Sequence, residues 1–320
     1  MNTILPLIQT ALELGLISSL TVLALFLSYS MLNVCDLSTD GCFTLGAAVG
    51  AVVAISGHPF LAILAAMGAG MLSGFLTAFL QTKMGVDSLL AGIVVNTGLY
   101  SINIAVMGNS SLLNMNKTET VFTLMQKALK GTFLESQYKL VVIVAAVVLV
   151  IVFLTLFLHT RLGLAIRATG NNPAMVKSSS INTVMMTIIG LVIANAFTGL
   201  SGCLLAQSQK SVNIDIGTGM VTIALASLLI GNTFFGRFSI LLRAIGAVAG
   251  SFIFRFVYTI ALRFNMPAYM LKLVSAVIVV LAISGPYLRN RAKLLKRNLS
   301  LHSMPKEEDG NTDAGEDRSC

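Results

Sequence analysis

The chain has 320 residues, of which 56% are hydrophobic and 11% are charged, and its formal net charge at pH 7 is +8. Soluble domains carry about 25% charged residues, so this composition and a mean hydropathy of +0.87 exclude a soluble globular protein. The positive charge lies in short loops and in a basic run near the C-terminus, a distribution that suits anionic lipid headgroups and gives no reason to expect nucleic-acid binding.

Nine apolar runs are candidate membrane-spanning helices. About 20 residues cross the hydrocarbon layer as a helix, and the second and seventh runs are shorter than that, which is typical of broken or re-entrant helices. The sequence therefore predicts an all-α membrane protein, a polytopic helical bundle of about 8–10 spans. Residues 1–288 would form the transmembrane domain and residues 289–320 a cytoplasmic tail, first basic and then acidic and disordered. The nine runs are residues 5–29, 41–56, 60–80, 89–107, 140–158, 183–206, 219–231, 239–262 and 268–284.

The two short runs resemble each other. Asp36 precedes the sequence GCFTL, and Asp215 precedes GMVTI. Such a pattern is typical of an internal repeat whose discontinuous helices lie beside a solute pathway, although small residues also serve simply to bring membrane helices close together. Asp36 and Asp40 have helix capping as their alternative role. The candidate residues of the pathway or the broken helices are Asp36, Gly41, Thr44, Asn96, Asp215, Gly219 and Thr222.

Polar and charged residues inside the apolar runs need a reason. Arg243 and Lys272 lie close enough to the ends of their runs to reach the headgroups. Arg255 lies nearer the middle, so it either reaches the headgroups or faces protein or a cavity. A further set of asparagines either lines a polar path or forms hydrogen bonds between helices. These are Asn96, Asn103 and Asn195.

No enzymatic motif is present. The sequence lacks Walker A, HExxH and GxSxG patterns, and its cysteines form no metal-binding spacing, so we expect neither catalysis nor a cofactor nor a metal site. The only acid inside an apolar run is Glu13, whereas ion-coupled transporters usually keep a carboxylate within a span. We interpret the cysteines as small apolar residues. They are Cys35, Cys42, Cys203 and Cys320.

One polar insertion, residues 161–182, separates two long apolar runs. Its three cations and its lack of acids place it on the cytoplasmic side. Asn172 is a good N-cap and Pro173 suits the first turn of a helix. We therefore expect a surface loop that contains one short helix, from Pro173 to about Ser180. Alternation of the spans then places residues 108–139 outside, the C-terminus in the cytoplasm and the N-terminus outside.

Four stretches together resemble a known family, the permease subunits of bacterial ABC importers for branched-chain amino acids, ribose and autoinducer-2. Within this superfamily the nearest group is paired with binding lipoproteins of the tryptophan and tyrosine type. Each stretch alone is weakly specific, but they extend over almost the whole membrane region. They are DLSTDGCFTLGAAVGA (residues 36–51), LLAGIVVNTGLYSIN (89–103), RLGLAIRATGNNPAMV (161–176) and GTGMVTIALASLLIGN (217–232).

The resemblance implies a multi-pass permease of the bacterial plasma membrane that translocates a small solute, an amino acid, with aromatic amino acids among the implied solutes. Its implied partners are a cytoplasmic ABC ATPase that carries out ATP hydrolysis, an extracytoplasmic substrate-binding lipoprotein, a second permease copy in a homodimer, and membrane lipids. The rivals are an ion-coupled secondary transporter and a structural subunit that conducts nothing.

The resemblance also implies that the polar insertion contains the helix that docks on the ATPase. Two positions depart from the family pattern: Ser180 stands where the family usually has Gly, and Asn232 where it often has Glu. The residues implied in coupling to the ATPase are Arg161, Arg167, Gly170, Asn172, Pro173, Met175 and Val176.

Overall fold

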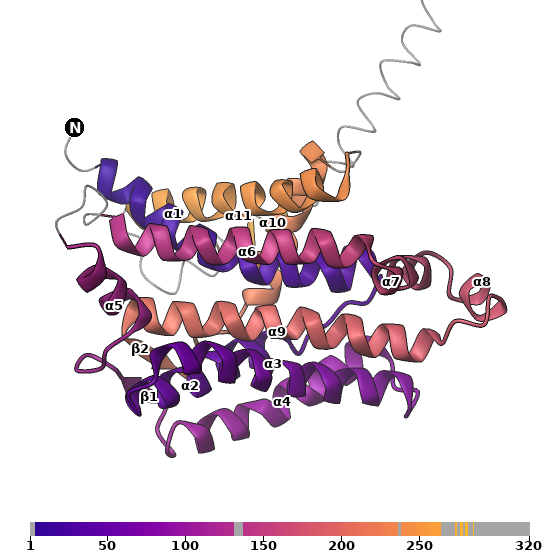
Figure 1. The fold of residues 1–320 in the computed structure, drawn as a ribbon, viewed down its shortest axis with the longest axis horizontal. Helices are drawn as coiled ribbons and strands as arrows, with labels where there is room; N and C mark the ends of the chain where they lie inside the picture. The colour runs from indigo at the N-terminus through magenta and orange to yellow at the C-terminus, as the bar shows by residue number, and fades with distance from the viewer. Residues whose placement is uncertain are drawn as a thin grey trace, which may run out of the picture.

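The computed structural model describes residues 4–130, 137–235 and 238–263 and, beyond these, residues 273, 276, 277, 279, 280 and 284. The described residues form an elongated helical bundle with a small two-stranded sheet at one end (Figure 1). Six helices within them are long and apolar enough to cross a membrane, and two shorter apolar helices accompany these. The predicted all-α polytopic membrane fold is confirmed.

The elements follow one another with short connections. In chain order they are α1 (Ile4–Leu25), the π-helix η1 (Phe26–Met31), α2 (Thr39–Ile55), α3 (Pro59–Thr82), α4 (Ser88–Val106), β1 (Leu112–Asn114), α5 (Val121–Ala128), α6 (Tyr138–His159), α7 (Arg161–Asn171), α8 (Pro173–Ser178), α9 (Thr183–Gln209), β2 (Ser211–Asn213), α10 (Met220–Phe235) and α11 (Ile240–Arg263). The first eight predicted spans correspond to helices. Most of the ninth, residues 268–284, and the whole predicted tail, residues 289–320, lie outside the described residues.

Helix α9 is the centre of the bundle and packs against α1, α2 and α3. Small residues let these backbones approach closely, as is usual between membrane helices. A Cβ atom built on Gly199 would collide with the carbonyl oxygen of Ala66 in α3, and one on Gly202 with the carbonyl oxygen of Phe43 in α2. The interior around α9 therefore has no room for larger side chains at these positions.

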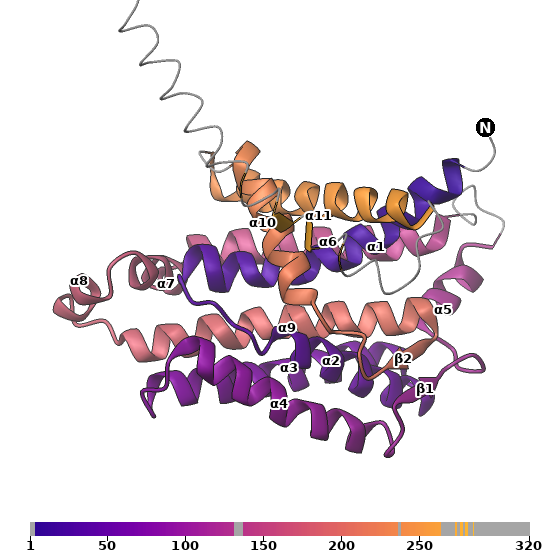
Figure 2. The same ribbon diagram turned by 180° about the vertical axis from the view of Figure 1, so that it is seen from behind.

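The two short helices both begin inside the bundle. After η1 a non-helical segment, residues 32–38, leads to the start of α2, and after β2 residues 214–219 lead to the start of α10 (Figure 2). The two starts lie against each other, because Asp40 of α2 accepts hydrogen bonds from the backbone of Gly219 and Val221. The prediction of two short helices is confirmed, and the internal repeat stays a prediction.

The bundle has two distinct ends. Helices α7 and α8 lie at one end, and β1, β2 and α5 at the other, where α1 also begins (Figure 1). Strands β1 and β2 pair antiparallel.

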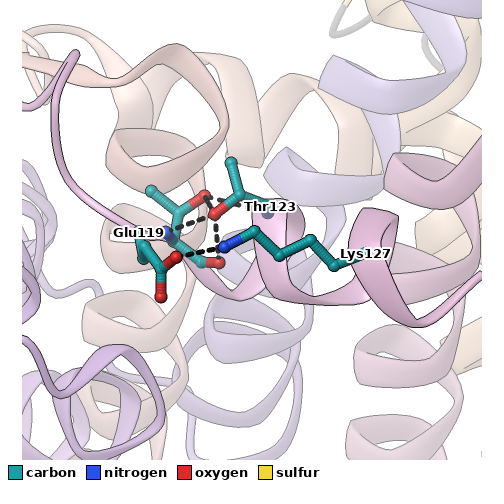
Figure 3. Close-up of polar contacts among 4 residues, drawn as sticks. Glu119, Thr123 and Lys127 are labelled. Atoms are coloured by element: carbon teal, nitrogen blue, oxygen red, sulfur yellow. Dashed lines mark hydrogen bonds and ion pairs between the residues drawn. The ribbon is translucent and has the colours of Figure 1, made fainter.

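Helix α5 is anchored at the sheet end by its capping. The Thr120 hydroxyl accepts a hydrogen bond from the Thr123 amide, and the Thr123 hydroxyl accepts one from the Thr120 amide. The Val121 N–H donates to Gln207 of α9 at 2.9 Å. The Lys127 ammonium forms an ion pair with Glu119 beside this cap (Figure 3), but both side chains are more than half exposed, so the pair adds little stability.

We predict that the two ends of the bundle lie on opposite sides of the membrane. Ser178 of α8 and Asn114 of β1 are both exposed and lie at opposite ends. In a background with serine at Cys35 and Cys320, we expect a membrane-impermeant maleimide to label Asn114→Cys on intact cells and Ser178→Cys only after permeabilisation. Lysines occur at both ends, among them Lys127 near the sheet, so charge alone does not decide the orientation. The reverse labelling pattern would invert the topology.

The close packing around α9 predicts an unequal response of two helical glycines to the same change. Gly202→Ala places a methyl group against backbone in α2, and overpacking of this kind costs about 1–3 kcal/mol. Gly68→Ala in α3 is the matched control, because no atom lies within 4 Å of the added Cβ. We expect a lower Tm in detergent for Gly202→Ala and an unchanged or higher Tm for Gly68→Ala. Equal Tm values would show that the α2–α9 contact relaxes without cost.

Candidate functional site

A cavity of about 400 Å³ lies where the starts of α2 and α10 meet the C-terminal half of α4. Its volume is within the range of small-molecule sites. Three parts of the chain form its wall: the first turns of α2, one face of α4, and the segment that precedes α10. The lining residues are Asp40, Gly41, Thr44, Asn96, Thr97, Tyr100, Ser101, Asn103, Ile214, Asp215 and Thr218.

The start of α2 is held by a buried carboxylate. Asp36, which is 2% exposed, accepts hydrogen bonds from the Ser38 amide at 2.8 Å and the Ser38 hydroxyl at 2.6 Å. Its second oxygen accepts a hydrogen bond of 2.6 Å from the Asn195 amide, near the middle of α9. Asp36 therefore fixes the beginning of α2 to the central helix and does not line the cavity.

The start of α10 is held by a second carboxylate, from the first turn of α2. The two oxygens of Asp40 accept hydrogen bonds from the Gly219 N–H at 2.9 Å and the Val221 N–H at 2.8 Å. The first N–H groups of a helix have no partner within the helix, so at a start inside the bundle they need an acceptor from another part of the protein. Gly219 adopts φ +82°, a conformation that suits glycine. Asp40 thus acts as a cap, as expected for one of its two roles, but it caps a helix far away in the sequence.

The C-terminal half of α4 presents polar side chains to the cavity. Asn96, Thr97, Tyr100 and Ser101 recur at helical spacing and line one wall, and the last three are exposed in this chain. The fifth polar residue, Asn103, is buried and donates a hydrogen bond of 3.2 Å to the Gly41 carbonyl. Sequence reasoning singled out only Asn96 and Asn103 here, although the i, i+1, i+4, i+5 spacing of polar residues within an apolar run was a usable signal.

The predicted pathway residues divide into two groups. Gly41, Thr44, Asn96 and Asp215 line the cavity. Asp36 and Gly219 lie beside it in the capping contacts described above, and Thr222 is exposed on α10 away from the lining. Asn195 does not line the cavity. Its amide bonds Asp36 in the segment before α2, so it joins α9 to that segment and not to another helix.

The polar insertion, residues 161–182, differs from the predicted loop with one helix. It contains two helices, because residues 161–171 form α7 as well. Its buried residues Gly163, Ile166 and Thr169 recur every third position, which was the missed helical signal. The Thr160 hydroxyl caps it by accepting the Gly163 N–H at 3.2 Å.

Helix α8 begins as predicted and ends at Ser178, two residues earlier than expected. The Asn172 side chain accepts the Met175 N–H at 3.1 Å, which is the expected N-cap. Ser180 has φ +61°, in the left-handed region that favours glycine. This left-handed conformation explains why the related family usually has glycine at this position.

The residues implied in coupling occupy different environments in the insertion. Arg161, Asn172 and Pro173 are exposed, and Met175 is 61% exposed. Val176 is 2% exposed, so it holds α8 against the body.

Two other residues implied in coupling, Arg167 and Gly170, lie on the side of α7 that faces the bundle. Arg167 is half-buried. A Cβ atom on Gly170 would collide with the Met31 carbonyl at the end of η1.

The cations inside the spans face protein where they are described. Arg255 Nε donates a hydrogen bond of 3.0 Å to the Ser18 hydroxyl in α1, so it does not reach for the headgroups. The Arg243 guanidinium lies 5.4 Å from the centre of the Phe26 ring. Lys272 lies outside the described residues. Cys42 and Cys203 are buried and free, in agreement with their interpretation as small apolar residues.

An all-helical membrane bundle in which two helices begin inside the protein beside a polar cavity has the construction of a membrane transport protein. The comparison with known sequences then gives the family. Residues 7–283 match the family described as branched-chain amino acid transport system / permease component, and the chain belongs to it. It is a multi-pass permease of the ABC transporter class, located in the inner membrane.

Three relatives show the breadth of the similarity. A tyrosine transport system permease protein of Clostridioides difficile (strain R20291) is 33% identical over 83% of this chain and 86% of its own length. A ribose import permease protein of Escherichia coli (strain K12) is 28% identical over 78% of this chain and 75% of its own. An uncharacterized protein of Rickettsia prowazekii (strain Madrid E) is 29% identical over 86% and 96%. No solved structure shows significant similarity to the chain.

The contact between α2 and α10 predicts that replacing Asp40 lowers solute uptake. Asp40→Ala leaves the Gly219 and Val221 N–H groups without their acceptor, and an unsatisfied buried group costs about 1–3 kcal/mol. Asp87→Ala is the matched control, since Asp87 caps α4 through the Leu89 N–H at an exposed site away from the cavity. We expect solute uptake to fall strongly only in Asp40→Ala, measured at equal amounts of inserted protein. An equal loss in both variants would assign the effect to helix capping in general.

Proposed function

We propose that this chain is the membrane-spanning subunit of an ATP-driven importer. It passes a small amino acid, with aromatic amino acids as the favoured class, from an extracytoplasmic binding lipoprotein to the cytoplasm, while a separate ABC ATPase hydrolyses ATP. Family membership supports the importer class, and the similarity to a tyrosine transport permease supports the substrate class.

The observation that carries the proposal is the polar cavity at the start of the two short helices. Its wall includes Thr97, Tyr100 and Ser101, which are exposed on a helix that is otherwise apolar on its outer face. The Thr97 hydroxyl donates to the Ile93 carbonyl of its own helix, so Tyr100 and Ser101 are the groups that need polar surroundings, because polar groups that face hydrocarbon without partners are unfavourable. The cavity is therefore a water-accessible solute path that a second copy of the chain covers, which makes the working unit a homodimer with lipids around it.

Helices α7 and α8 are the proposed coupling element. Exposed Met175 would face the ATPase, whereas buried Val176 keeps α8 fixed to the bundle. Movement of α8 would pass directly into α9, which follows it in the chain, and the bond from Asn195 to Asp36 would carry it to the start of α2. ATP binding at the ATPases would in this way change the cavity and drive alternating access.

The rival function, ion-coupled secondary transport, needs a carboxylate inside the membrane. Asp36 and Asp40 stand at segment ends that lie inside the bundle, where both accept hydrogen bonds from groups that fix helix starts. Asp215 lies at the cavity wall without such a role. The assignment of the energy source to ATP is therefore supported by family membership.

The energy source has a direct test. We expect uptake of L-tyrosine into proteoliposomes that hold the permease, its ATPase and its binding lipoprotein to require ATP hydrolysis. Uptake should continue when ionophores collapse the proton and sodium gradients. Gradient-dependent uptake by the permease alone would replace the importer with the secondary transporter.

The proposed coupling role of α8 predicts that the same substitution at two exposed methionines affects ATPase binding differently. Met175→Asp places a charge on the face of α8 proposed to lie against the ATPase, where an unpaired buried charge is strongly unfavourable. Met84→Asp is the matched control: Met84 is 63% exposed, close to the 61% of Met175, and lies in the connection from α3 to α4. We expect the ATPase to co-purify poorly with Met175→Asp alone, with loss of transport and normal insertion. Normal ATPase recovery with Met175→Asp would remove α8 from the coupling role.

A further inference from the structure

The lining of the cavity carries charge of one sign. Two of its residues, Asp40 and Asp215, have carboxylates, and its lining includes no Lys, Arg or His. The remaining polar groups are hydroxyls and asparagine amides. A cavity with carboxylates at its wall and a partly apolar surround raises the local concentration of cations and lowers that of anions.

The two carboxylates have acceptor capacity left. A carboxylate can accept about four hydrogen bonds, and Asp40 uses part of this capacity on the backbone N–H groups at the start of α10, including those of Gly219 and Val221. Asp215 is exposed, and its backbone is engaged on both sides: its N–H donates to the Asn213 side chain and its carbonyl accepts from the Thr218 N–H. In the part of the chain that the structure describes, its side chain accepts no hydrogen bond. Asp215 is thus a carboxylate at the cavity wall without a structural task.

A buried amide adds a third acceptor. Asn103 is 1% exposed and lines the cavity. Its NH₂ group donates to the Gly41 carbonyl, which can only accept, so the orientation of the amide is determined. The Asn103 Oδ1 atom has no hydrogen-bond partner among the described residues. Buried polar atoms normally have partners, and this one needs a donor.

The start of α10 is not available to an anion. In many transporters the N-terminus of a broken helix binds an anionic group of the substrate. Here Asp40 already occupies the N–H groups of Gly219 and Val221, and its charge offsets the positive end of the helix dipole. The cavity therefore offers acceptors and negative charge where such sites usually offer donors.

We propose that this cavity recognises the protonated amino group of the solute, with Asp215 as the principal counter-charge and Asp40 and Asn103 as further acceptors. A primary ammonium group has three N–H donors, which match these acceptors. The assignment rests on the proposed function in treating the cavity as the solute path. Solutes that carry a carboxylate without an amine are excluded by repulsion, and neutral sugars gain no ion pair.

The test reads the cavity directly, without the binding lipoprotein, whose own selectivity would obscure that of the permease. The permease–ATPase complex carries Ser101→Cys on the cavity wall, with serine at Cys35 and Cys320. The rate of maleimide labelling is measured with equal millimolar concentrations of tyramine, L-tyrosine, 3-(4-hydroxyphenyl)propionate and D-ribose. We expect tyramine and L-tyrosine to slow labelling several-fold and the other two to have no effect. Thr97→Cys, on the same wall, serves as a second reporter.

Two carboxylate variants complete the test. Asp215→Asn should abolish protection by tyramine, and Asp87→Asn, a capping aspartate outside the cavity, should retain it. The proposal is overturned if the propionate protects as well as tyramine, if no compound protects, or if Asp215→Asn leaves protection unchanged. ATP-dependent uptake by the parent protein is measured in parallel. Uptake without amine-selective protection refutes this inference alone, whereas amine-selective protection without ATP-dependent uptake refutes the importer and leaves the cavity assignment standing.

Discussion

The structure depends on one constraint: two helices begin inside the bundle, where the N–H groups of their first turns have no partner within the helix. Asp40 meets this requirement at α10, whose start it joins to α2. Asp36 accepts the N–H of Ser38, the N-cap residue of α2, and fixes this start to α9 through Asn195. These contacts bring segments more than 150 residues apart to one place, and the cavity exists because they meet there.

Close backbone packing makes this arrangement possible. α9 can reach both α2 and α3 only because glycine stands at the contacts, as at Gly199 and Gly202. The small residues that sequence reasoning attributed either to a pathway or to packing therefore serve packing around α9, while Gly41 both packs against Leu99 and lines the cavity. The two interpretations are compatible at Gly41, which serves both purposes.

The proposed sequence of movements uses elements that are rigid and directly connected. Helix α8 leads into α9, and α9 holds the start of α2, so a displacement at the exposed end has a short physical route to the cavity. The start of α10 at the cavity differs from helix starts that bind an anionic substrate group, because Asp40 already occupies its first N–H groups and leaves carboxylate acceptors in their place. This difference connects the capping that stabilises the fold with the selectivity proposed for the solute.

The sequence by itself determined the membrane class, eight of the spans, the two short helices and the N-cap at Asn172, because hydrophobic run length and local capping are properties of neighbouring residues. It also carried the four stretches that indicate the family. Only the tertiary structure decided that Asp40 caps α10, that Asn195 binds Asp36, and that the polar face of α4 opens on Asp215. These contacts join distant segments, and their partners depend on where each helix begins in space. The start of α10 lies inside the bundle, where its backbone N–H groups need an acceptor, and the carboxylate that supplies it, Asp40, comes from elsewhere in the chain.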